Sequence, residues 1–230
     1  MNIILNMDCF DYLRETKDRF TTIFADPPDG IGLNYSGFED KIDDYEQYIR
    51  ELLLRSYSRC AFFWLSFNPI RTLEVAKASP YNWPVKHCVQ TFTFGQHNQN
   101  DLGTNHRPLW RYGSGTLYPD SIRIPSWRQE NGDKRADPRG RVPGDVFDIP
   151  RVTGNSSQRR SWHPTQLHED LVERCIKLTT PKSGSVLDLF AGTGTVHRVC
   201  KRLGIRSTSI EISEHYYKLL VSEDKNAVPR

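Results

Sequence analysis

No uninterrupted apolar run in the sequence is long enough to cross a membrane, because none approaches the roughly 18 to 20 residues that a bilayer span requires. The opening Met1-Asn-Ile-Ile-Leu-Asn-Met-Asp8 also lacks the basic segment and the long apolar core of a secretory signal. These absences exclude a recognisable anchor or export signal. We therefore expect a soluble, cytoplasmic protein that has no membrane partner.

Cysteine is scarce, and its spacing excludes two kinds of site. The five cysteines never form a CxxC pair, and most lie in apolar stretches typical of strands or helices. Free thiols in a reducing compartment are therefore expected instead of disulfides. The histidines show neither an HExxH motif nor a combined His/Cys spacing. The sequence accordingly predicts no metal site.

The length of 230 residues suits one domain, or one domain that carries an insertion. The net charge of +3 is small but unevenly distributed, at −3 over residues 1–90, +4 over residues 91–160 and +2 over residues 161–230. Ten of the eleven cations in the middle segment are arginine. Arginine presents a planar fork of donors that matches phosphate or a guanine edge, which favours nucleic-acid recognition. The alternative is a solvated polar insertion without a partner.

Hydrophobic patterning divides the chain into three zones. Residues 1–94 alternate short β-rich runs with helical patterns, and residues 161–230 do the same. Strands separated by helices are typical of βαβ units with a parallel sheet. Residues 95–160 break this rhythm with Gly, Pro, Asn and Arg. A long aperiodic stretch in a compact domain is usually functional or disordered, so we interpret it as an insertion that carries recognition.

A glycine turn lies between two strands of the third zone. The strand 185–190 leads into glycines at 192 and 194, and Glu211 follows at the end of the next strand. The glycines let the backbone approach a ligand, and the carboxylate can accept both hydroxyls of a ribose. A third glycine and a GK[ST] sequence are absent. The pattern therefore favours a ligand bound through its adenosine, such as S-adenosylmethionine, although an ordinary β-α turn would look the same.

A second candidate site follows the strand 21–25, where Asp26-Pro-Pro-Asp29 comes at its carboxyl end. Ligands bind at this edge in open α/β sheets. Two prolines fix the backbone and remove two donors, so the segment offers only hydrogen-bond acceptors. Such an array suits an exocyclic NH2 group, because Asp26 and the Pro27 carbonyl can each accept one N–H. The alternative is a plain turn after a strand.

Three motifs in a fixed order carry a family resemblance: Asp26-Pro-Pro, Trp162-His-Pro-Thr-Gln before a helix, and Phe190-Ala-Gly-Thr-Gly. Together they resemble the β group of S-adenosylmethionine-dependent DNA amino-methyltransferases. The similarity covers roughly residues 1–70 and 160–217. It implies a Rossmann-like α/β fold in permuted motif order, with a seven-stranded mixed sheet, helices on both faces and a small recognition insertion. The expected parts are a catalytic half (1–94), a basic target-recognition insertion (95–160) and a cofactor-binding half (161–230).

The resemblance also implies roles for individual residues. S-adenosyl-L-methionine would be the cofactor, held by Asp8, Cys9, His163, Pro164, Thr165, Phe190, Ala191, Gly192, Thr193, Gly194 and Glu211. The catalytic segment would be Asp26, Pro27, Pro28 and Asp29. Contacts to the substrate are expected from Tyr35, Phe38, Arg107, Arg111, Arg128, Arg135 and Arg139.

Asp29 is the main departure from the family pattern, which has an aromatic residue there that stacks on the flipped base. Tyr35 or Phe38, in the loop downstream, could supply the missing ring. Alternatively, Asp29 could accept a hydrogen bond from a base that the family does not usually meet. The position therefore bears on the identity of the target base and on activity itself.

The sequence is best explained as a DNA methyltransferase that acts on the N6 amine of a flipped adenine, because Asp before Pro-Pro favours adenine in this family. Three alternatives stay open: the same chemistry on cytosine N4, a modified base or RNA; a catalytically idle DNA-binding relative; and a small-molecule methyltransferase. DNA is the expected partner, and the sequence leaves a homodimer open.

Overall fold

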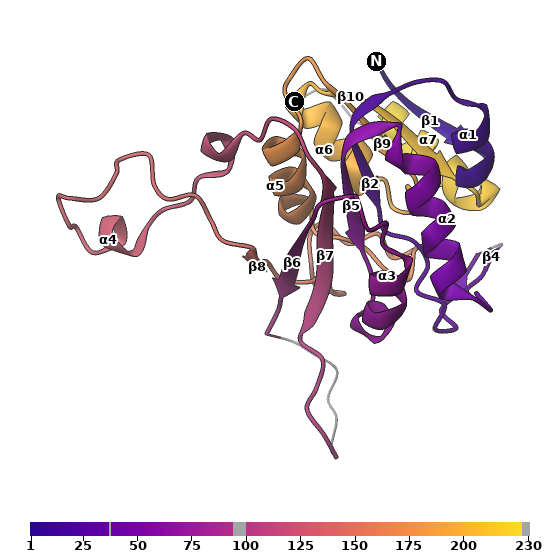
Figure 1. The fold of residues 1–230 in the computed structure, drawn as a ribbon, viewed down its shortest axis with the longest axis horizontal. Helices are drawn as coiled ribbons and strands as arrows, with labels where there is room; N and C mark the ends of the chain where they lie inside the picture. The colour runs from indigo at the N-terminus through magenta and orange to yellow at the C-terminus, as the bar shows by residue number, and fades with distance from the viewer. Residues whose placement is uncertain (37, 94–99, 227–230) are drawn as a thin grey trace.

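The protein is built on one large sheet, seen in a computed structural model that describes residues 1–36, 38–93 and 100–226 (Figure 1). The sheet has eight strands in the order β1-β10-β9-β2-β5-β7-β6-β8. They are β1 (Asn2–Asn6), β2 (Phe20–Ala25), β5 (Cys60–Ser66), β6 (Val85–Thr91), β7 (His106–Gly113), β8 (Val146–Asp148), β9 (Ser185–Asp188) and β10 (Arg206–Glu211). The short strands β3 (Asn34–Tyr35) and β4 (Phe38–Glu39) pair with each other outside this sheet.

The five strands from β1 to β5 in this order run parallel, and β7 runs antiparallel to both of its neighbours, β5 and β6. The predicted mixed sheet is therefore confirmed, but it has one strand more than the seven expected. The additional strand is β8, which pairs in parallel with residues 89–91 of β6 at the edge of the sheet. The sequence gives this three-residue strand little periodicity, so its pairing comes from the tertiary fold.

Helices cover both faces of the sheet, as predicted. The helices of the body are α1 (Cys9–Glu15), α2 (Tyr45–Tyr57), α3 (Thr72–Ala78), α5 (Glu169–Thr179), α6 (Thr195–Leu203) and α7 (Glu214–Asn226), with the 3-10 turn η1 (Pro69–Arg71). The short helix α4 (Trp127–Glu130) and the 3-10 turn η2 (Pro119–Ile122) lie outside the sheet layers. Side-chain caps begin several of the helices. Asp44 accepts the amide of Gln47 to start α2, and the His168 ring accepts the amide of Asp170 to start α5.

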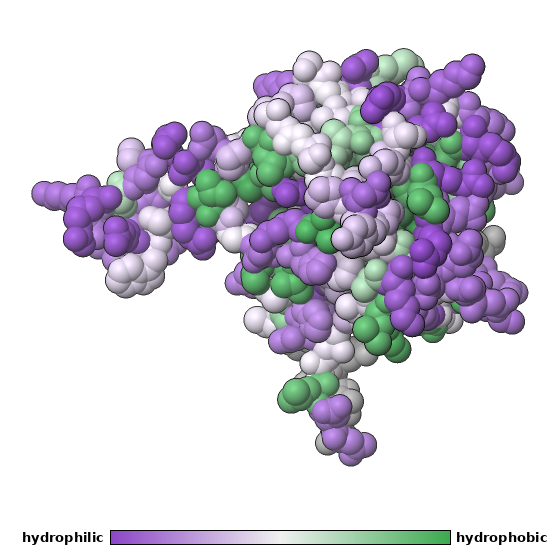
Figure 2. Space-filling view, viewed as in Figure 1, coloured by the Kyte–Doolittle hydropathy of each residue, from purple (hydrophilic) through white to green (hydrophobic). Residues whose placement is uncertain are grey.

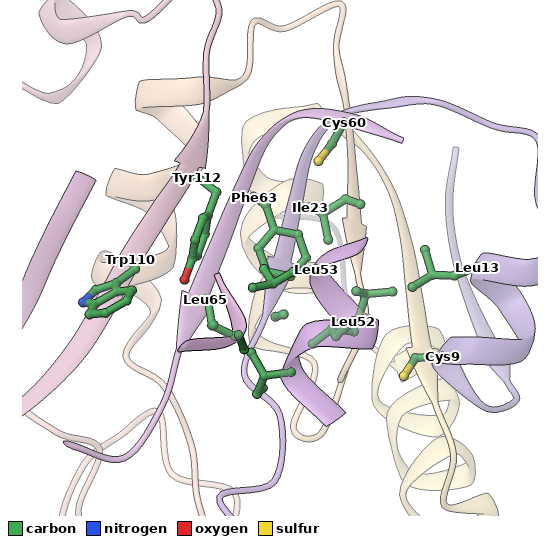
Figure 3. Packing of buried hydrophobic residues seen from close by; sticks show 14 of the residues in the cluster. Cys9, Leu13, Ile23, Leu52, Leu53, Cys60, Phe63, Leu65, Trp110 and Tyr112 are labelled. Carbon is green, nitrogen blue, oxygen red and sulfur yellow. The ribbon is translucent and has the colours of Figure 1, made fainter. Parts of the chain in front are cut away.

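The core has one cluster on each face of the sheet. On one face, α1 and α2 bury leucines such as Leu13 and Leu53 in one cluster, and Figure 3 shows Leu53 beside Phe63 of β5. On the other face, α5 and α6 pack their apolar sides against Trp64. Neighbouring residues of β5 thus point to opposite faces, and both faces are buried. This explains why the run 61–66 reads as continuously apolar.

β7 lies inside the sheet between β5 and β6, so residues 106–113 of the expected insertion belong to the sheet. Arg107 and Pro108 make β7 difficult to recognise in the sequence, because proline is rare in central strands. Pro108 is tolerated because it lies beyond Ser66, the last residue of β5. Its carbonyl accepts the Phe67 amide on that side, and the N–H that proline lacks would point to the same side. The expected start of the insertion near residue 95 lies outside the described residues.

Residues 114–145 are the part of the expected insertion that leaves the sheet, and we call them the arm. The arm extends away from the body beside α5 and is mostly hydrophilic (Figures 1 and 2). It carries six Lys/Arg and five Asp/Glu, a net charge of only +1. Its base is held on α5 by hydrogen bonds from Tyr118 N to the Leu178 carbonyl and from Ser121 Oγ to the Lys177 carbonyl, both 2.8 Å.

All five cysteines are buried free thiols, as the sequence predicted. Across the described residues, no helix combines the length and the apolar character that a bilayer crossing demands.

Candidate functional site

A cavity of about 660 Å³ opens where the parallel strands end at their carboxyl termini. Its size lies in the range of about 300 to 1,000 Å³ that is common for small-molecule sites. Most of the predicted site residues line it: Asp8, Cys9, Asp26, Pro27, Pro28, Asp29, Tyr35, Arg107, His163, Pro164, Thr165, Phe190, Ala191, Gly192, Thr193 and Glu211. Segments that are far apart in sequence thus share one cavity.

Asp26 follows β2 directly and pairs with Arg107, whose Nη2 lies 2.9 Å from Asp26 Oδ1. Burial raises the pKa of the Asp26 carboxyl, Arg107 lowers it, and the charge of Asp29 raises it. Arg107 was expected to contact DNA. Its guanidinium instead pairs with Asp26 and Asp29, because the start of β7 lies next to the end of β5 beside Asp26.

Asp29 is 5% exposed and is held by protein donors on both oxygens. Arg107 Nη1 donates to Oδ2 at 3.0 Å, and the Asn68 amide donates to Oδ1 at 2.8 Å. Arg71 Nε also donates to the Asp29 carbonyl at 2.8 Å. The side chain is therefore engaged in an internal ion pair, which argues against the expectation that it accepts a hydrogen bond from an unusual base.

Gly192 and Glu211 form the centre of the glycine turn. The Gly192 amide donates to Glu211 Oε2 at 2.8 Å, and the Ser213 amide donates to Oε1 at 2.9 Å. Burial raises the pKa of Glu211. Gly192 has a φ of +48°, and a Cβ there would lie 3.2 Å from His163 Nε2. Glycine is therefore required both by the conformation and by the close approach of the imidazole.

Gly194 supports the turn without lining the cavity. It has a φ of +75° at the start of α6, and a Cβ would lie 2.5 Å from Leu220 Cδ2. The turn can pack against α7 only because this position has no side chain. Its contribution to a ligand site is therefore indirect.

His163 packs among aromatic rings at the same end of the cavity. Its ring centroid lies 4.6 Å from that of Tyr216 and 5.5 Å from that of Tyr35. Burial lowers the pKa of His163 to about 4, so the ring is neutral at pH 7. Its Nδ1 lies 2.6 Å from the Thr165 carbonyl, so Nδ1 carries the proton and Nε2 is an acceptor facing Gly192. Tyr35 therefore lies beside His163, at the glycine-turn end.

Asp8 and Cys9 border the cavity at the start of α1. Asp8 Oδ1 accepts the amides of Phe10 at 2.7 Å and Asp11 at 3.2 Å, which caps the helix. Cys9 is buried, and desolvation raises the pKa of its thiol. Neither residue presents a reactive group, so both act here as walls of the cavity.

Asp188 is a cavity residue that the sequence analysis missed. It is the last residue of β9 and only 1% exposed, and its Oδ2 has no hydrogen-bond partner within the described part of the chain. Burial raises the pKa of Asp188 to about 8. The rule that identified Asp26, a carboxylate at the carboxyl end of a parallel strand, applies equally to Asp188. With this raised pKa, Asp188 is mostly protonated at pH 7, and a cationic ligand bound beside Oδ2 would stabilise its ionised form.

Four further residues that line the cavity were also missed: Gln90, Phe92, Arg151 and Arg159. The Arg151 guanidinium lies 4.8 Å from the centre of the Phe92 ring. Gln90 Nε2 donates to the Ile149 carbonyl at 2.8 Å, which fixes the orientation of its amide. The arginines belong to the basic middle segment, but no spacing in the sequence distinguishes them from the others.

Four arginines that were expected to contact the substrate lie outside the cavity. Arg111 packs over the rings of Phe62 and Trp64 at 5.6 and 6.0 Å, and burial lowers its pKa. The others are exposed on the arm, where they pair with nearby aspartates: Arg128, Arg135 and Arg139. The side chain of Phe38 lies outside what the structure describes.

The high pKa of Asp188 predicts how stability depends on pH. An unfolded aspartate has a pKa of about 3.9, whereas Asp188 titrates at about 8 in the folded protein. Between these values the folded state binds the extra proton, so the free energy of unfolding falls as the pH rises. We expect the Tm of the ligand-free protein to fall by about 7 to 15 °C between about pH 5 and pH 8. Scanning calorimetry of the wild type and Asp188→Asn measures this, and the variant should show a flatter dependence. An equally steep dependence in the variant would assign the effect to other groups.

The residues of the glycine turn fit S-adenosylmethionine. Asp188 offers a free buried carboxylate oxygen to a cation, Glu211 stands at the end of the adjacent strand, and Gly192 leaves the turn open to close approach. A carboxylate at this position suits ribose hydroxyls.

Comparison with known proteins identifies the family. A family model described as DNA methylase, for N6 and N4 enzymes, matches residues 20–222. The type II methyltransferase M2.DpnII of Streptococcus pneumoniae is 44% identical over 246 residues, which cover 94% of this chain and 87% of that protein. Two other type II methyltransferases are longer, and the chain spans 44% and 35% of their lengths.

Two solved structures share the fold at low sequence identity. M1.HpyAVI in complex with SAM superposes with a TM-score of 0.66 at 17% identity, covering 97% of this chain and all of that one. The cytosine-N4-specific PvuII DNA methyltransferase gives a TM-score of 0.74 at 12% identity, covering 96% of this chain and 85% of that one. The resemblance carried by the three motifs is thereby confirmed: the chain belongs to the S-adenosylmethionine-dependent DNA amino-methyltransferases of the N6/N4 family.

Proposed function

We propose that this protein transfers the methyl group of S-adenosylmethionine to the N6 amine of an adenine that is flipped out of DNA. The observation that carries this proposal is that Asp26 lines the same cavity as Gly192 and Glu211. The carboxylate that would bind the amine and the glycine turn that would bind the cofactor therefore line the same cavity. A base stacked in a duplex cannot reach the edge of this sheet, so the base must be extruded or already single-stranded.

The chain's own residues position the amine and exclude water. Asp26 and the Pro27 carbonyl accept the two N–H groups of the amine and direct the nitrogen lone pair towards the cofactor end of the cavity. When bound, S-adenosylmethionine supplies a methyl group that is already activated by the sulfonium. Orientation and desolvation therefore account for most of the rate acceleration. The amine releases a proton during or after the transfer.

At the cofactor end, we assign Glu211 to the ribose and the orphan oxygen of Asp188 to the positive charge of the methionine part. The turn 190–193 contacts the methionine part through its backbone, next to His163 and the residues that follow it. Asp8 and Cys9 border the adenine ring. Gly194 acts through the packing of α6 on α7, as its position outside the cavity indicates.

Adenine is favoured over cytosine because an acidic residue precedes the two prolines. Cytosine N4 is the second candidate, since the cytosine-N4-specific PvuII enzyme has the same fold. The test is to incubate the protein with DNA and S-adenosylmethionine that carries an isotopically labelled methyl group, to digest the product and to identify the nucleoside by mass. Labelled N6-methyldeoxyadenosine is expected. Label in N4-methyldeoxycytidine or only in RNA would replace the proposal, and DNA binding without label would indicate an idle relative.

The arm is proposed to contact the DNA backbone through Arg128, Arg135 and Arg139, whose side chains are largely exposed. Each arginine is partly neutralised by a nearby aspartate, so we expect contacts to phosphate to be few. Trp127, 73% exposed on the same short helix as Arg128, offers a ring for stacking. Recognition by so small an element suits a short target sequence.

Alanine at all three arm arginines is expected to weaken DNA binding and to reduce the slope of log affinity against log salt. Each lost phosphate contact lowers that slope by about 0.9, so the triple variant should lose about 2 to 3. Fluorescence anisotropy over a salt series measures both quantities. Arg14→Ala is the matched control, because Arg14 is an exposed arginine paired with Asp11 on α1, away from the arm (Figure 1). An unchanged slope in the triple variant would remove the arm from the interface.

A further inference from the structure

Arg107 joins the two carboxylates of the loop that follows β2. Its Nη2 donates to Asp26 Oδ1 at 2.9 Å and to Asp29 Oδ1 at 3.2 Å, and its Nη1 donates to Asp29 Oδ2 at 3.0 Å. Its Nε donates to Ser66 Oγ at 2.8 Å, at the end of β5. Every nitrogen of the guanidinium thus has a protein acceptor. The plane of the group is fixed, and little of its donor capacity is left for a phosphate.

Arg107 and Asp29 are largely buried, so their ion pair is not a solvent-exposed salt bridge. The side chain of Arg107 is 22% exposed and that of Asp29 is 7% exposed. A buried arginine beside one carboxylate costs desolvation energy that a single bond does not offset, whereas bidentate pairing with additional hydrogen bonds can offset it. Asp29 supplies the bidentate pairing. Arg107 can then extend its Nη2 to Asp26 while its own charge stays compensated.

We propose that Arg107 is a positioning residue for methyl transfer, that it holds Asp26 Oδ1 so that Oδ2 faces the amine of the substrate base, and that Asp29 serves to fix Arg107. This inference rests on the proposed role of Asp26. A free carboxylate rotates about its Cβ–Cγ bond, and the salt bridge removes that rotation before the substrate arrives. Asp29 thereby has a function at the position where related enzymes carry an aromatic ring.

The charges of Arg107 and Asp29 act on Asp26 in opposite directions: the arginine lowers the pKa of Asp26, and the aspartate raises it. The ionisable groups whose charges interact with Asp26 come from the loop after β2, β3, α2, β7 and β9, and they are Asp29, Tyr35, Tyr45, Arg107 and Asp188. Burial raises the pKa of both tyrosines, so they stay neutral across the working range. Replacing Arg107 or Asp29 with a neutral residue should therefore move the titration of Asp26 in opposite directions.

The test is the pH dependence of kcat for methyl transfer to DNA in the wild type and three variants. Arg107→Met should lower kcat about 100-fold at pH 7, because the acceptor is no longer oriented, and should move the acidic limb of the profile to higher pH. Asp29→Asn should move that limb to lower pH. Arg107→Lys should keep the limb near that of the wild type but lower kcat, since an ammonium retains the charge without the fork.

Arg111→Met is the matched control, because Arg111 is a partly buried arginine of the same strand with no carboxylate partner among the described residues. Its limb should stay in place. Calorimetric binding of S-adenosylmethionine shows that each variant is folded, and if Arg107→Met does not fold, the Asp29→Asn and Arg107→Lys profiles decide the question. If the limbs of folded Arg107→Met and Asp29→Asn stay in place or move in the same direction, or if the limb of Arg107→Lys moves as far as that expected for Arg107→Met, the inference alone is overturned. A wild type that methylates no DNA overturns the proposed function, and this inference with it.

Discussion

Replacing Asp26 with alanine is expected to abolish methyl transfer while leaving the binding of S-adenosylmethionine nearly unchanged. In the proposed mechanism the Asp26 carboxylate accepts a hydrogen bond from the amine, and removing a preorganised polar group from a transition state typically costs about 100- to 1,000-fold in kcat. The variant also leaves Arg107 with one fewer carboxylate in a buried setting. The loss should therefore reach at least the upper part of this range. Transfer of a radiolabelled methyl group to DNA measures it.

Two further variants separate the chemistry of Asp26 from its structural role. Asp26→Asn keeps one oxygen acceptor and should retain a small residual rate. Asp148→Ala removes an exposed carboxylate that also ends a strand of the sheet but does not line the cavity, so its rate should equal that of the wild type. Methyl transfer that survived in Asp26→Ala at the wild-type rate would remove Asp26 from the catalytic role.

Local sequence signals predicted both halves of the site because each half is built by one strand and the turn that follows it. Asp26 after β2 and Gly192 after β9 lie next to each other in space, since parallel strands end at the same edge of the sheet. This prediction requires only an apolar strand and the turn that follows it, and no knowledge of contacts between residues that are far apart in the sequence. The same rule applies to Asp188, which ends β9 just before the glycines of the turn.

The ion pair of Asp29 could not be predicted because its partner, Arg107, is 78 residues away in the sequence. Arg107 was assigned to DNA because it belongs to an arginine-rich segment, and composition does not distinguish an arginine at a sheet edge from one on a surface loop. The proline that follows it also concealed β7, and with β7 its place in the sheet. Because β7 is not recognisable in the sequence, neither the extent of the sheet within residues 95–160 nor the contacts of Arg107 could be predicted.

The charge distribution along the sequence did not predict where the basic residues of the middle segment lie in the structure. The excess of +4 over residues 91–160 does not sit on the arm, which carries only +1. Much of the remainder comes from arginines near the cavity, such as Arg151 and Arg159. The basic character of the middle segment therefore belongs more to the mouth of the site than to the projecting element, which places the expected attraction for DNA close to Asp26.

Replacing Glu211 with alanine is expected to weaken the binding of S-adenosylmethionine by about 1.5 to 3 kcal/mol, the usual value for a hydrogen bond to a charged group, which is about 10- to 150-fold in Kd. Two losses combine. The ribose loses its carboxylate acceptor, and the amides of Gly192 and Ser213 lose the oxygens that now hold the turn at 2.8 and 2.9 Å. Isothermal titration calorimetry measures the change.

Glu214→Ala is the matched control for Glu211, because Glu214 lies three residues further on, is exposed and pairs only with Lys218 among the described residues. Its affinity should equal that of the wild type. Glu211→Gln separates the two losses, since an amide can still accept from one backbone N–H but places an NH2 group against the other. It should therefore bind more weakly than the wild type even if the ribose contact survives. Wild-type affinity in both Glu211 variants would place the ribose elsewhere and leave Glu211 as a support of the turn alone.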